Sequence, residues 1–85
     1  MNNAKRRKNE KQFGNWSETE AGGRIYWVEI VGRFGWKARY IKEVGLEEET
    51  LAFRQEIFDE NGVLREIHEK FPFDKGHQKL DRHDN

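Results

Sequence analysis

Histidine, arginine and glutamate lie close together in the second half of the sequence. Acid–base catalysis on a phosphate ester uses residues of these types. His68 could take a proton, and Glu66 could orient its imidazole ring. Arg54 or Lys70 could stabilise the phosphate. A small metal-independent endoribonuclease would use such a set. The same residues also suit ordinary cross-strand charge pairs on a half-exposed sheet, and the sequence favours this simpler interpretation.

A basic stretch near the start, AKRRKNEK, is the clearest indication of a partner. Its cations are Lys5, Arg6, Arg7, Lys8 and Lys11, against one acid, Glu10. On a flexible arm these residues could hold phosphates, with an affinity that falls steeply as salt rises. The alternative is a solubility tail that pairs loosely with Glu47 to Glu49. The sequence supports both interpretations equally.

The stretch FPFDKGH, residues 71–77, follows the last long predicted strand. Pro72 has no backbone donor and ends the ladder there. Lys75 and His77, beside this sheet edge, could form a binding lip. Imidazole and carboxylate groups also suit zinc or iron, but the spacing of His68, His77 and Asp74 matches no metal signature. We therefore expect no metal site.

The composition narrows the function classes. Lysine plus arginine total 16, as do aspartate plus glutamate, so the net charge is zero, whereas a general nucleic-acid binder usually carries excess positive charge. Cysteine is absent, which excludes disulfides and thiolate sites. No apolar run approaches the roughly 20 residues of a membrane span, and no apolar core follows the basic start as in a signal peptide. We expect a cytoplasmic protein without a cofactor.

The length of 85 residues predicts a single domain. Only 34% of the residues are hydrophobic, but 13% are aromatic, and these large side chains can each bury a large area in a core. We expect a flexible basic arm over 1–12, one small β domain over 13–80 and a flexible tail over 81–85.

The first half of this domain predicts a β-hairpin over 24–44, because β-branched and aromatic residues dominate and GRFG interrupts the run. A two-residue loop at Arg33 and Phe34 would place Trp27 opposite Tyr40. These two rings would then share one apolar face of the sheet.

The second half predicts another hairpin over 51–71. A three-residue loop, 60–62, with Gly62 in the left-handed region, pairs Asp59 with Val63 and sets the apolar residues on one face. His68 then lies opposite Arg54. A helix over 46–59 competes, because glutamates occupy its first turn, and it would give a β-β-α-β order. We favour the strand, and with it a mainly β fold: a single antiparallel sheet of about four strands in meander order.

Aromatic residues on the second, mixed face bear on the partner. If Tyr26, Phe34 or Phe58 is uncovered, it could stack on bases or contact a protein. A second copy of the chain covering these rings would instead make a homodimer.

Three features recur in a comparable order in known proteins: Arg39-Tyr40 on one strand, the turn from Asp59 to Gly62, and Pro72 followed by His77. With these features the chain resembles a short prokaryotic domain family of unknown function and, more faintly, small β-rich toxin–antitoxin components. The histidine-rich closing cluster of the latter group is absent, so the resemblance implies a toxin–antitoxin or regulatory setting and no catalytic residue.

The sequence thus predicts a small non-enzymatic binding module that acts on a protein or a nucleic acid. A metal-independent endoribonuclease and a structural homodimer are the alternatives.

Overall fold

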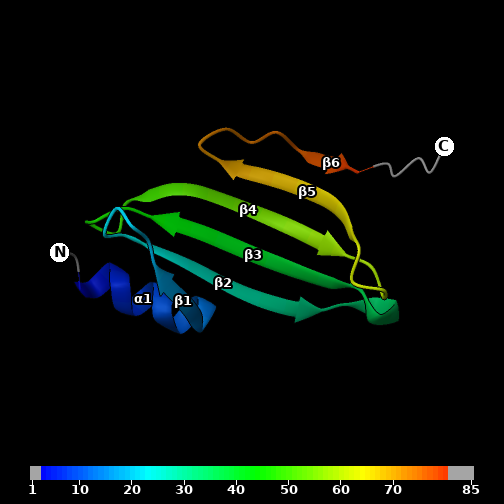
Figure 1. Ribbon diagram of the computed structural model, residues 1–85, viewed down its shortest axis with the longest axis horizontal. Coiled ribbons are helices and arrows are strands. Elements are labelled where there is room, and N and C mark those ends of the chain that lie inside the picture. The colour runs from blue at the N-terminus through cyan, green and yellow to red at the C-terminus, as the bar shows by residue number, and fades with distance from the viewer. Residues whose placement is uncertain (1–2, 81–85) are drawn as a thin grey trace.

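The computed structural model describes residues 3–80 and shows a mainly β protein with one helix (Figure 1). All strands belong to one antiparallel sheet in the order β1-β2-β3-β4-β5-β6, which confirms the predicted meander. The elements are α1 (Asn3–Phe13), β1 (Asn15–Glu18), β2 (Arg24–Val31), β3 (Lys37–Val44), β4 (Thr50–Phe58), β5 (Leu64–Phe71) and β6 (His77–Lys79). Short strands β1 and β6 form where a loop and a coda were predicted, so the sheet has six strands instead of about four.

The basic segment forms helix α1, so the expected flexible arm is wrong over the described residues. Its alanine, lysine, arginine, glutamine and glutamate residues are strong helix formers. The helix ends at Gly14, which has φ 80° and donates its backbone N–H to the carbonyl of Glu10 at 2.9 Å, as a left-handed C-cap does. Asn9 and Phe13 are its buried residues. The tail predicted over 81–85 lies outside the described residues.

Helix α1 packs on one face of the sheet, which we call the helix face. Phe13 contacts Tyr26 and Val44 there, and Val28, Tyr40 and Phe53 pack around them. The opposite face, which we call the open face, carries Ile25, Trp27 and Ile41 from the alternate positions of β2 and β3. Within residues 3–80 no further element packs on the open face, because the remaining elements are strands of the same sheet and a short turn (Figure 1).

The first hairpin has a longer loop than predicted. Gly32 donates its N–H to the carbonyl of Trp36 at 2.7 Å, which leaves a three-residue loop, Arg33–Gly35. Phe34 and Gly35 both adopt positive φ. The extra loop residue slips the register by one, so Trp27 pairs with Ile41 and lies on the opposite face from Tyr40.

The second hairpin confirms the predicted loop and the strand over 50–58. Asp59 pairs with Val63 through a 2.9 Å hydrogen bond, and Gly62 has φ 78°. The register beyond the loop is wrong, because a bulge between Ile57 and Phe58 shifts the pairing by one residue. As a result His68 pairs with Gln55 and not with Arg54.

Candidate functional site

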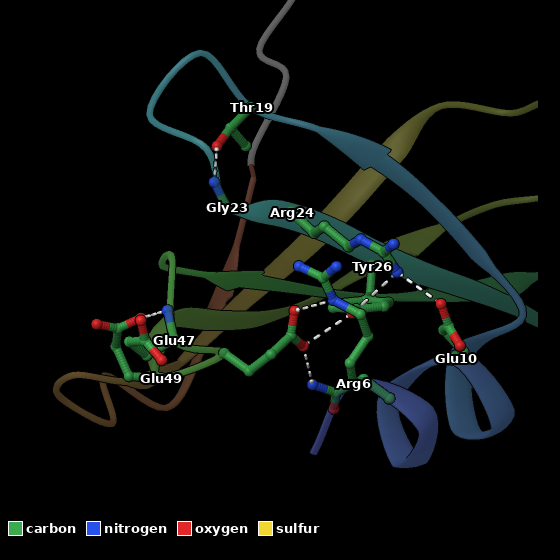
Figure 2. Close-up of polar contacts among 10 residues, drawn as sticks. Arg6, Glu10, Thr19, Gly23, Arg24, Tyr26, Glu47 and Glu49 are labelled. Atoms are coloured by element: carbon green, nitrogen blue, oxygen red, sulfur yellow. Dashed lines mark hydrogen bonds and ion pairs between the residues drawn. The ribbon is translucent and has the colours of Figure 1, made fainter. Parts of the chain in front are cut away.

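A buried carboxylate holds α1 against the sheet. Glu48, in the turn between β3 and β4, is 2% exposed and has a left-handed backbone with φ 63°. Its carboxylate accepts hydrogen bonds from Arg6 Nε at 3.1 Å, Asn9 Nδ2 at 3.1 Å and the Tyr26 hydroxyl at 2.8 Å. Figure 2 shows Arg6 reaching from α1 toward this point. The Glu48 carboxylate, the Asn9 amide and the Tyr26 hydroxyl thus all have hydrogen-bond partners, as buried polar groups require.

A second link fixes the other side of the helix. Arg24 on β2 donates to Glu10 at 2.7 Å (Figure 2). The guanidinium carbon of Arg24 lies 5.0 Å from the centre of the Trp16 ring. The two links set α1 at a fixed angle on the sheet, so side chains on the remaining flank of α1 face β3, β4 and β5 across a groove.

The hydrogen bonds around Glu48 and its burial change the pKa values of the groups there. Burial alone raises the pKa of Glu48, but the hydrogen bonds from Asn9, Tyr26 and Arg6 together lower it below its usual value. Burial, and then the bond to Glu48, raise the pKa of Tyr26. Glu48 is therefore charged at neutral pH, and its acceptor capacity is directed inward.

The first part of the groove is a polar hollow of about 250 Å³. Its walls are Lys5, Lys8, Asn9 and Gln12 from α1, and Lys42, Glu48 and Thr50 from the sheet side. Burial lowers the pKa of Lys42; Glu48 opposes this change, and the neighbouring charges of Lys8 and Lys5 add to it. Ammonium groups from two different elements therefore crowd one hollow.

The second part of the groove is an adjoining hollow of about 380 Å³ with an aromatic floor. It shares Gln12, Lys42 and Thr50 with the first hollow and adds Phe13, Phe53, Lys70 and Phe71. The rings of Tyr40 and Phe53 stack with centroids 6.4 Å apart, and Lys70 Nζ lies 5.4 and 5.6 Å from their centres. Phe71 remains 44% exposed. We call the two hollows together the lysine groove.

Three lysines of this groove, Lys8, Lys42 and Lys70, form no ion pair with an acidic residue of the described part of the chain. Lys42 donates to the Asn9 amide oxygen at 3.0 Å. The one carboxylate that lines the groove, Glu48, is occupied by its three hydrogen bonds. Lys8, Lys42 and Lys70 thus bring more positive charge to the groove than the one carboxylate that lines it.

The predicted acid–base set is not brought together. His68 and Glu66 lie on the helix face, on alternate residues of β5, whereas Arg54 lies on the open face opposite Ile41 and bonds to Glu56 at 3.2 Å. The bulge between Ile57 and Phe58 separates them, because its extra residue, Arg65 of β5, shifts the pairing so that Arg54 and His68 lie on opposite faces.

The histidines instead form a cluster with acids at the β5–β6 edge. His68 Nε2 lies 2.6 Å from Asp74 Oδ1, and His77 Nδ1 lies 3.5 Å from Glu66 Oε1. The two imidazole centroids are 4.4 Å apart, and His68 Nδ1 is buried without a partner. A backbone bond from Gly76, and then His68, lower the pKa of Asp74. Rings in contact do not leave space for a phosphate between them, so this cluster does not place an acid and a base on two sides of a substrate.

The residues predicted to bind a partner do not lie on one surface. Lys5 and Lys8 line the groove, and Arg7 and Lys11 are exposed elsewhere on α1. Tyr26, which could bind a partner only with an uncovered ring, is fully buried beneath α1, so its predicted binding role is wrong.

Arg6 bonds Glu48, so the predicted pairing of the basic segment with Glu47 to Glu49 occurs at that residue, as a buried contact and not a loose one. Lys75 pairs with Glu69 at 2.9 Å, and half-exposed His77 lies beside Glu66. Lys75 and His77 are thus both next to acids at the β5–β6 edge.

Sequence reasoning missed Gln12, Lys42, Phe53 and Phe71 as groove residues. Their apolar and basic types carried no local signal, because the groove exists only once α1 packs on the sheet. No group of three or more histidine and acidic residues in the described part of the chain could hold a metal ion. No helix among these residues is long and apolar enough to cross a membrane.

Comparison with models of known protein families, with curated proteins and with solved structures finds no match for this chain. The resemblance to toxin–antitoxin components stays a prediction.

Proposed function

We propose that the protein is a small non-enzymatic binding module for single-stranded nucleic acid, which it holds in the lysine groove. The observation that carries this proposal is the meeting, in one groove, of accessible aromatic rings with Lys8, Lys42 and Lys70, none of which forms an ion pair within residues 3–80. Proteins that bind single strands combine a positively charged channel for the backbone with aromatic side chains on which bases stack.

In this proposal the polar hollow takes the phosphates. Lys8 and Lys42 approach it from α1 and from β3, so a phosphate between them would relieve their mutual repulsion. Gln12 and Thr50 offer hydrogen bonds to the sugar or the phosphate. Bases would then reach Phe53 and Phe71 in the adjoining hollow, with Lys70 above the stacked rings.

The groove favours a single strand over a duplex, because bases can reach aromatic rings only when they are unstacked from their partners. It also favours nucleic acid over a protein partner. A peptide would need acidic side chains at the spacing of the lysines, whereas a nucleic-acid backbone supplies one negative charge per nucleotide.

The test is binding of a fluorescently labelled mixed-sequence oligonucleotide, as RNA and as DNA, measured by anisotropy at several salt concentrations. We expect affinity to fall as salt rises. Lys8→Gln should weaken binding and reduce the salt slope by about one. The matched control is Lys11→Gln, which removes the same charge from the same helix outside the groove and should have a smaller effect.

Equal losses in these two variants would contradict a defined groove, and absence of binding at low salt would contradict the proposal as a whole. The RNA is then recovered after incubation in EDTA. Cleavage that disappears in His68→Ala would support the endoribonuclease alternative and overturn the non-enzymatic assignment.

A further inference from the structure

We infer that the open face is a self-association surface, on which a second copy of this chain packs with its own open face. This inference does not depend on the lysine groove, which lies on the opposite side of the sheet. It rests on the apolar area left uncovered, on how charges are arranged on the open face, and on the dimensions of the sheet.

The described residues bury little apolar surface for a folded chain. Four hydrophobic side chains are buried in this part of the protein: Phe13, Tyr26, Ile41 and Val44. Three of them belong to the contact between α1 and the sheet, while only Ile41 lies on the open face. A sheet must cover at least one face against another layer, and a small chain with so small a core is marginally stable alone. A second layer on the open face would supply the missing burial.

The open face has a central apolar hollow of about 280 Å³. Ile25, Trp27 and Ile41 line it together with Arg39 and Arg54. Tryptophan and arginine are the residues that most often carry the binding energy of protein interfaces. Half-buried Trp27, between two arginines, therefore suits the centre of an interface.

The two arginines that line this hollow are each paired with a glutamate, unlike Lys8, Lys42 and Lys70 in the lysine groove. Arg39 bonds Glu29 at 2.8 Å, and Arg54 bonds Glu56 at 3.2 Å. The guanidinium carbon of Arg39 also lies 5.0 Å from the centre of the Phe58 ring. A symmetric dimer brings a patch against itself, so a strongly charged patch would repel its copy. A patch with its arginines already paired does not.

The sheet is large enough for such an interface. The molecule measures 48 by 24 by 21 Å, and the long strands of the sheet run along its longest dimension (Figure 1). A standard protein interface buries about 800 Å² on each partner, which a face of this size can provide.

Packing through the open faces would leave the two lysine grooves on opposite outer sides of the dimer. Each groove would remain accessible, because α1 and the groove residues lie on the helix face. The occupant is therefore a second copy, and the dimer has a dry centre formed by Trp27 from both chains.

The experiment is sedimentation equilibrium of the full chain without nucleic acid, over a wide range of protein concentrations. The wild type should be dimeric, and Trp27→Lys should shift it to monomer. Ile30→Lys is the matched control, since Ile30 lies on the same strand, points to the helix face and is 53% exposed. It should leave the dimer intact.

Arg54→Glu tests the same surface without removing apolar packing. It places an unmatched negative charge beside Glu56 at a position that is accessible in the monomer, so the fold should survive and the dimer should weaken at least tenfold. Circular dichroism checks folding. A wild type that is monomeric at every concentration overturns the inference, as does a dimer that Ile30→Lys disrupts and Trp27→Lys and Arg54→Glu do not. Because no nucleic acid is present, these outcomes are independent of the binding assay.

Discussion

The two faces of the sheet differ in how their cationic side chains are paired with carboxylates. On the open face Arg39 and Arg54 each bond a glutamate on the same face. On the helix face Lys8, Lys42 and Lys70 surround a groove whose one carboxylate is already occupied by hydrogen bonds from its own chain. The net charge of zero therefore hides a local difference: the arginines on the open face are paired with glutamates, whereas lysine side chains gather in the groove on the helix face.

The difference has a simple structural origin. On the open face, charged residues that are cross-strand neighbours have opposite charges. Glu29 on β2, for example, lies directly opposite Arg39 on β3. On the helix face the neighbouring layer is α1, which presents lysines to a lysine of β3. The helix brings like charges together, and Glu48 is the residue that keeps it there.

Removing that carboxylate should have the largest effect. Glu48→Ala leaves Arg6 and Tyr26 without their acceptor at a buried position, which typically costs about 3 kcal/mol of unfolding free energy. Chemical denaturation followed by tryptophan fluorescence measures it. Glu20→Ala, in an exposed turn, is the control and should have almost no effect.

The same substitution separates the two faces. If α1 detaches, the lysine groove is lost while the open face keeps its residues, so nucleic-acid binding should fall far more than self-association. A Glu48→Ala protein as stable as the wild type would show that α1 docks by other contacts.

The stability should also depend on pH through Glu48. Its pKa is lower in the folded state than in the unfolded chain, where a glutamate titrates at about 4.3. Its contribution is thus fully present above that unfolded value and is lost as the pH falls through the lower folded value. In Glu48→Gln this contribution is absent, so the difference in unfolding free energy between wild type and variant should shrink from pH 6 to pH 3.

Other carboxylates titrate in the same range, and the comparison with Glu48→Gln subtracts them. Asp74, whose pKa is also lowered, is present in both proteins. A difference between the two proteins that does not change with pH would contradict a charged role for Glu48.

The sequence predicted the class of fold because strand patterns and turn residues are local. The loop around Gly62 could be predicted, since a left-handed position near Asp59 selects glycine. Which residues share a face could not, because one extra loop residue at Gly35 and one bulge at Ile57 each reverse the alternation.

The candidate site was harder still to predict from sequence. The helix was missed because α1 is polar all round and its stability comes from Asn9, Phe13 and the distant Glu48. Nothing distinguishes Glu48 from its glutamate neighbours in the sequence. Lys42 likewise becomes a groove residue only after the helix has docked.

A smaller effect is expected from the aromatic floor of the groove. Phe71→Leu removes a half-exposed ring from the second hollow and keeps an apolar side chain there, so folding should change little. Loss of a stacked base costs about 1 to 3 kcal/mol, and the lower value is expected because Phe53 remains. The affinity for a single strand should therefore fall by roughly fivefold to tenfold, with the salt slope unchanged, since no charge is removed.

The matched control is Phe73→Leu, which alters a ring that is 74% exposed and does not line the groove. It should bind as the wild type does. If both substitutions weaken binding equally, the bases contact the outer edge beyond β5 and not the groove. If neither does, the lysines act alone and the positive face recognises any flexible polyanion, which heparin competition in the same assay would then reveal.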